Sequence, residues 1–101
     1  MSKASRPYKE GLLKSLKDPS EAAAYLTAAL EDGSPDVFLV ALRHVAEAHG
    51  MTEVARGAQL HRVSMYRMLS ENGNPQLSSL TALLQQMGLR LAVEVGELAP
   101  A

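Results

Sequence analysis

A basic stretch at residues 55–70, "ARGAQLHRVSMYRMLS", combines side chains that can contact phosphate and carries no acid. Arg56, Arg62 and Arg67 are its cations, and His61 adds a further donor. Arginine can clamp a phosphate or form two hydrogen bonds with O6 and N7 of guanine. Serine and tyrosine hydroxyls can donate to phosphate, and valine can contact the methyl group of thymine. The composition is therefore typical of a surface that lies against nucleic acid.

The spacing of apolar residues in and around this stretch predicts two short helices joined by a turn. Their apolar positions are Val54, Ala55, Leu60, Met65 and Leu69. Helices of about seven residues are not stable alone, so both must pack on a core. This is the layout of a helix-turn-helix over about residues 52–70, in which the second helix enters the major groove of DNA.

With Met65 and Leu69 facing inward, the outward residues become the candidates for DNA contact. The predicted DNA-binding residues are Thr52, His61, Arg62, Val63, Ser64, Tyr66 and Arg67. Other interpretations stay open at this point. Short helix pairs occur in many helical proteins that never bind DNA, and Tyr66 could be a half-buried aromatic residue with only its hydroxyl in water.

Charge is segregated along the chain, although the net charge is only -1. Residues 1–17 carry five basic side chains and one acid, whereas residues 18–53 carry seven acids and one base. Residues 54–70 carry three bases and no acid, and residues 71–101 carry three acids and one base. Two basic segments separated by an acidic one indicate different faces or partners.

The 101 residues have the length of one domain, and we treat residues 1–101 as a unit. The chain has no cysteine, which excludes disulfides and thiolate metal sites. No apolar run is long enough for a signal peptide or a membrane span, so we expect a cytoplasmic protein that does not enter the membrane.

Catalytic groups are poorly arranged for an enzyme. His44 and His49 are five residues apart on a predicted helix and lie on roughly opposite faces, which makes a poor metal pair. Ser64 lies near His61, but no acid completes a triad. We expect no enzymatic activity, no metal and no cofactor.

Helix signals predict an all-α fold of five or six helices. A capping residue before proline marks three helix starts, at Asp18-Pro19, Ser34-Pro35 and Asn74-Pro75. Thr52 is a further predicted cap, for the first of the two short helices. Glycines after apolar-periodic segments mark helix ends at Gly33, Gly50 and Gly88.

After Gly88 the apolar period changes from helical spacing to alternation. Leu89, Leu91, Val93 and Val95 fall on one side, which predicts a short C-terminal β-strand. A lone strand cannot satisfy its backbone groups, so we expect these four residues to pair with a second copy across a dimer interface. Residues 96–101 are expected to be a disordered tail.

Residues 51–93, "MTEVARGAQLHRVSMYRMLSENGNPQLSSLTALLQQMGLRLAV", resemble the addiction module antidote proteins. These are HigA-like antitoxins with an Xre/Cro-type, lambda-repressor-like helix-turn-helix, and the resemblance covers about residues 8–95. The residues that match the motif of the family are Thr52, Val54, Ala55, Leu60, Arg62, Met65, Tyr66, Leu69, Ser70, Gly73, Asn74 and Pro75. The family usually has a glycine just before the position of Leu60, where this chain has Gln59. A left-handed conformation costs a residue with a side chain about 1 kcal/mol.

The resemblance implies a type II antitoxin that binds and neutralises a RelE/ParE-like toxin of the HigB group. It also implies that the protein binds operator DNA as a homodimer and represses its own operon. Because such toxins are usually basic, the acidic residues 18–53 are the candidate toxin-binding face. A solitary Xre-type regulator and a protein-interaction module without DNA binding remain alternatives.

Overall fold

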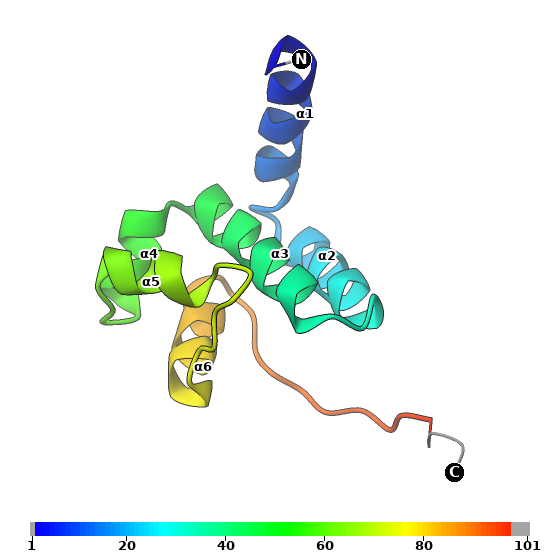
Figure 1. Cartoon of the computed structure of the whole chain (residues 1–101), viewed down its shortest axis with the longest axis vertical. Helices are drawn as coiled ribbons and strands as arrows, with labels where there is room; N and C mark the ends of the chain where they lie inside the picture. Colours follow the sequence, from blue (N-terminus) through cyan, green and yellow to red (C-terminus); the bar gives the residue numbers. More distant parts are fainter. Residues whose placement is uncertain (1, 98–101) are drawn as a thin grey trace.

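The computed structural model describes residues 2–97, and the side chains of residues 8–97 (Figure 1). This part of the chain forms six helices: α1 (Ser2–Ser15), α2 (Pro19–Glu31), α3 (Pro35–His49), α4 (Met51–Gly57), α5 (Arg62–Met68) and α6 (Leu77–Gln86). The all-α prediction with five or six helices is confirmed for the described residues.

Two of the three predicted helix starts are correct. The Asp18 carboxylate accepts a hydrogen bond from the Ser20 backbone N–H at 2.9 Å, and Pro19 occupies the first position of α2. Pro35 likewise occupies the first position of α3, with Ser34 extended before it, but the Ser34 side chain makes no capping hydrogen bond. Proline suits this position because its missing N–H has no partner in the first turn of a helix.

The third start was predicted two residues too early. Helix α6 begins at Leu77 rather than Pro75, because Gln76 is still extended, with φ -69° and ψ 151°. The first helical hydrogen bond runs from the Leu80 N–H to the Gln76 carbonyl at 2.9 Å. The Thr52 cap is also wrong, since α4 already begins at Met51 and Gly50 takes the capping position.

Helix α3 is the centre of the fold. It contacts α1, α2 and α4, and α4 in turn contacts α5 and α6. The buried core of the described residues contains only apolar side chains, and its largest fully buried members are Leu16, Leu42, Val45, Met65, Leu69, Leu83 and Met87. Burial of a side chain of this size contributes about 1.5–3 kcal/mol, so the core holds the short helices in place.

Helix α1 is attached to the rest of the protein by its C-terminal half, and its N-terminal half projects away from the core (Figure 1). Leu16, just after the helix, is buried, and Leu12 and Leu13 pack partly against the same core. The Lys9 ammonium lies 3.9 Å from a Glu47 carboxylate oxygen on α3. At this distance and exposure the ion pair contributes little to stability, so the leucines anchor the helix.

The C-terminal strand predicted at residues 89–95 is wrong. Residues 89–97 form an extended segment without secondary structure, which leaves α6 and runs past the α2–α3 end of the molecule (Figure 1). The described residues contain no strand with which this segment could form a ladder of hydrogen bonds, and a strand needs such a partner. Residues 98–101 of the predicted tail lie outside the described part of the chain.

A tyrosine–histidine contact joins α2 to α3. The Tyr25 hydroxyl lies 2.8 Å from Nδ1 of His44, and both side chains are partly buried. Burial lowers the pKa of His44; Glu47 opposes this effect, and Arg43 and Lys9 add to it. Burial also raises the pKa of the Tyr25 hydroxyl, as does the nearby Tyr8. The neutral forms of both groups are therefore favoured in the folded protein.

We predict that His44 makes the protein less stable in mild acid. Its pKa is lower in the folded than in the unfolded chain, so its stabilising effect is present above the ordinary value of 6.5 and is lost as the pH falls below it. In urea unfolding between pH 7.5 and pH 5, the His44→Gln variant should lose less unfolding free energy than the wild type. His61→Gln, which removes an exposed histidine, should keep the wild-type pH dependence. Parallel pH profiles for wild type and His44→Gln would contradict this assignment.

Candidate nucleic-acid interface

Helices α4 and α5 contact each other, and both are held by their inner faces. Val54 and Ala55 of α4 are buried, and Met65 and Leu69 are fully buried with 0% exposure. Leu60, in the turn, packs partly against the same core. All five apolar positions predicted from the sequence therefore pack inward. Their burial determines which side of α5 faces the solvent.

The turn between α4 and α5 depends on a residue with positive φ. The Leu60 N–H donates to the Ala55 carbonyl at 2.8 Å, and the Gln59 N–H donates to the Arg56 carbonyl at 3.1 Å. This pair of bonds is a Schellman motif, which requires a left-handed residue, here Gln59 with φ 59°. The same pair of bonds ends α6, where Gly88 has φ 76°. The turn thus keeps the geometry suited to glycine although a side chain is present.

A second tight point follows α5. The Gly73 N–H donates to the Ser70 carbonyl at 2.9 Å, and a Cβ atom at Gly73 would overlap the backbone carbonyl of Met68. The overlapping group is backbone, which cannot rotate away as a side chain can. Glycine at this position, which also matches the antidote motif, is therefore a steric requirement of the chain reversal after α5.

The structure leaves the predicted DNA-binding residues accessible. Arg62, Val63, Tyr66 and Arg67 are exposed on α5, with 70% exposure for Val63 and 39% for Tyr66, and Ser64 is partly exposed. His61 is exposed at the N-cap of α5, and Thr52 is exposed on α4. The 39% exposure of Tyr66 also fits a half-buried aromatic residue with its hydroxyl in water.

Arg62 and Arg67 are free of carboxylate partners among the described residues, where the ion pairs join Lys9 to Glu47 and Arg56 to Glu53. The Arg62 guanidinium carbon lies 5.8 Å from the centre of the Tyr66 ring, a cation–π geometry one helical turn apart. This contact restrains the guanidinium while leaving its five donors available for an acceptor. Arg56 differs, since its Nη1 lies 3.2 Å from Glu53.

A depression of about 380 Å³ lies where α1, α3, α4 and α5 meet, and it brings together three of the predicted residues, Thr52, Arg62 and Tyr66. Lys9 of α1 lines the same depression, and Glu47 and Glu53 line it as well. The assignment from the sequence omitted Lys9. The excess of basic residues in the N-terminal segment indicated that this segment could contribute cations to the surface. Only the packing of α1 on α3 brings Lys9 near α5.

The four predicted dimer-interface residues are not equivalent in the structure. Leu89 packs partly against the core of its own chain. Leu91 is 45% exposed, and Val93 and Val95 are fully exposed, at 99% and 102%. The alternating face that the sequence predicted is therefore divided between the core of the chain and the solvent.

The described residues contain no metal-ligand cluster and no helix that could span a membrane. No three His, Asp or Glu side chains there lie close enough together to hold a metal ion. Among the helices of residues 2–97, none is both long enough and apolar enough to cross a membrane.

Comparison with known proteins identifies the family. A family model described as "Probable addiction module antidote protein" matches residues 9–95, which include all of α2 to α6. The chain belongs to this family. An uncharacterized protein of Haemophilus influenzae is 29% identical to it over 79 residues, which cover 78% of this chain and 81% of the relative. No solved structure matches the chain. The antidote family assignment supports an antitoxin role and implies a toxin as partner.

We predict that Gln59→Gly stabilises this antidote protein by about 0.5–1 kcal/mol. The substitution removes the cost of a side chain in the left-handed region, and this gain exceeds the entropy cost of an added glycine. The measurement is the free energy of unfolding from urea titration.

The reciprocal substitution supplies the control. Gly88→Gln places a side chain at the same position of the equivalent motif after α6, where a Cβ meets only ordinary contacts with Pro19. It should destabilise the protein by about 1 kcal/mol. A loss of stability in Gln59→Gly would mean that the Gln59 side chain contributes more than its strained backbone costs.

Proposed function

We propose that this chain is the antitoxin of a type II toxin–antitoxin module, in which it binds and neutralises a RelE/ParE-like toxin of the HigB group in the cytoplasm. The observation that carries the proposal is the match of the antidote family model to residues 9–95. The toxin class rests on the HigA-like resemblance of residues 51–93. We assign the protein a binding role and no catalytic one.

We further propose that α4 and α5 are a lambda-repressor-like, Xre-type helix-turn-helix and that the protein represses its own operon. Three features support this. The inner face of α5 is buried through Met65 and Leu69, its outer face presents Arg62 and Arg67 without carboxylate partners among the described residues, and residues 55–70 contain no acid. A carboxylate on this face would repel the DNA backbone, whereas arginine attracts it.

The operator complex requires a dimer if the operator consists of two half-sites, and we propose that the protein is a homodimer. The exposed apolar side chains of Leu91, Val93 and Val95 are a candidate contact surface for the second copy. Light scattering at micromolar concentration would test this, and a monomer there would contradict it.

The toxin assignment is tested by co-expression with the product of the neighbouring open reading frame. If that product is a toxin, its expression alone should arrest growth, and the wild-type chain should restore growth and co-purify with it. A neighbour that has no effect on growth and does not bind would overturn the antitoxin proposal. It would favour the second candidate, a solitary Xre-type regulator, which the exposed arginines of α5 also support.

We predict that Arg62→Ala combined with Arg67→Ala weakens binding to DNA from upstream of the gene by about 2–4 kcal/mol in total. The affinity should also depend less steeply on salt, by about one unit of slope for each phosphate that the variant no longer binds. Fluorescence anisotropy at several salt concentrations measures both quantities.

The matched control for this experiment is Arg56→Ala with Arg90→Ala, which removes the same charge from two exposed arginines outside α5. It should retain most of the affinity. If the Arg62/Arg67 variant binds DNA as tightly as the wild type, the assignment of α5 is wrong. If the wild type does not bind DNA at any salt concentration, the interaction module without DNA binding becomes the better interpretation.

A further inference from the structure

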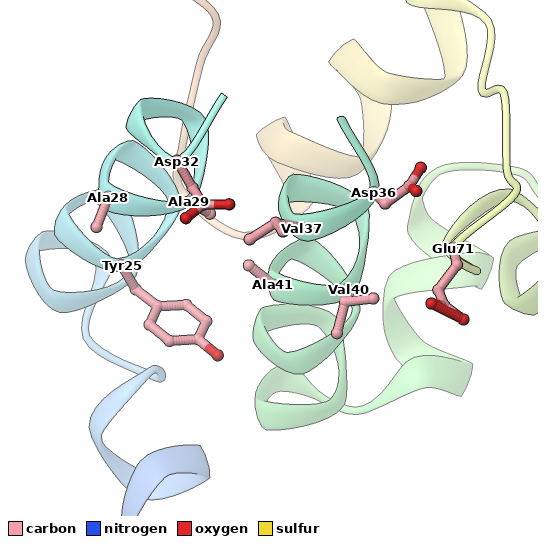
Figure 2. A pocket seen from close by; sticks show the side chains of 9 residues that line it. All are labelled: Tyr25, Ala28, Ala29, Asp32, Asp36, Val37, Val40, Ala41 and Glu71. Carbon is pink, nitrogen blue, oxygen red and sulfur yellow. The ribbon is translucent and has the colours of Figure 1, made fainter. Parts of the chain in front are cut away.

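An apolar groove between α2 and α3 lies outside the proposed DNA-binding surface. Its volume is about 450 Å³, and α5 contributes no residue to its lining. The floor is formed by Ala28 and Ala29 of α2 and by Val37, Val40 and Ala41 of α3, and the ring of Tyr25 closes one side (Figure 2). Val37 is 40% exposed, so apolar surface is open to the solvent here.

Three carboxylates belong to the lining of this groove. Asp32 follows α2, and Asp36 is in the first turn of α3. Glu71, in the connection between α5 and α6, belongs to the lining from the side of α3 that faces away from α2 (Figure 2). The lining contains no lysine, arginine or histidine. Among the described residues none of the three carboxylates has a cationic partner within 4.0 Å, since the ion pairs there involve Glu47 and Glu53.

The positions of two of these acids do not stabilise the helices. Asp32 occupies the C-cap of α2, and Glu71 follows α5 by a few residues, so both lie near the negative end of a helix dipole. A carboxylate there is slightly destabilising unless a cation lies nearby. Asp36 differs, because an acid in the first turn of α3 is favourable.

We propose that the α2–α3 groove binds an amphipathic, basic segment of the cognate toxin. The apolar floor would bury the apolar side chains of that segment, and Asp32, Asp36 and Glu71 would pair with its lysine or arginine residues. Charge complementarity selects this occupant over an acidic or uncharged one. The inference rests on the proposed antitoxin function and adds the location and chemistry of the binding surface.

The location also bears on how the two proposed activities combine. The groove is lined from α2, α3 and the connection after α5, whereas the proposed DNA contacts lie on α4 and α5. Binding in the groove therefore does not itself use Arg62 or Arg67.

The first test uses two synthetic amphipathic peptides with the same leucine face and either lysine or glutamate on the polar face. Only the lysine peptide should shift the NMR amide signals of Tyr25, Val37, Val40 and Glu71, and its affinity should fall as salt is added. A variant with Asp32→Asn, Asp36→Asn and Glu71→Gln should bind this peptide at least ten-fold more weakly. The control variant, with Glu10→Gln, Glu94→Gln and Glu97→Gln, loses the same charge from exposed acids outside the groove and should bind like the wild type.

The second test uses the toxin itself, as the product of the neighbouring open reading frame. The groove variant should lose growth rescue and at least ten-fold in toxin affinity, while its affinity for upstream DNA stays within two-fold of wild type. Val37→Arg, which adds a cation to the floor without changing a buried side chain, should have the same effect. Circular dichroism checks that both variants are folded.

Each outcome separates the two proposals. If the wild type rescues growth and the groove variants rescue equally well, the groove assignment is wrong while the antitoxin function stands. If the wild type neither rescues growth nor binds the neighbouring product, the antitoxin function fails and the toxin assignment of the groove fails with it. Lysine-peptide shifts outside the groove would also overturn the inference. So would a dimer that dissociates in Val37→Arg, because the groove would then bind a second copy.

Discussion

The burial of Met65 and Leu69 is the interaction on which the proposed DNA-binding surface depends. Helices α4 and α5 have seven residues each, too few for independent stability, so their orientation is set by what their inner faces bury. Once these two side chains are fully covered, the period of the helix turns Arg62, Tyr66 and Arg67 toward solvent. The side of α5 on which the exposed cations lie is therefore a consequence of apolar packing.

The fold places part of the charge that is segregated along the chain on different faces. The acidic segment forms α2 and α3, and two of its carboxylates border the apolar groove between them, where Glu71 joins them from a later part of the chain. The cations of residues 54–70 lie on α4 and α5 instead. A net charge of -1 conceals this arrangement. The separation is partial, because Glu47 and Glu53 of the acidic segment line the depression beside Arg62.

Local sequence signals were accurate where a residue acts on its own backbone. Asp18 caps α2, the prolines begin α2 and α3, and the apolar period identifies the inner residues of α4 and α5. These signals failed where the local structure depends on contacts with other segments of the chain. The alternation at residues 89–95 has no strand beside it among the described residues, and α6 begins after an extended Gln76 in spite of the Asn74-Pro75 signal. Lys9 was omitted because its proximity to α5 depends on how α1 packs.

The sequence by itself determined the helical class, the inward residues of the two short helices and the acid-free basic stretch, because helix period, capping and charge act over a few residues. The sequence also shows that Gln59 stands where the family usually has glycine. Its left-handed conformation, however, depends on the turn that α4 and α5 make when both pack on the core. Tertiary structure alone decided that Asp32, Asp36 and Glu71 share one groove and that Lys9 and Arg62 line one depression. The physical reason is that contacts between distant residues depend on helix packing, which no local pattern encodes.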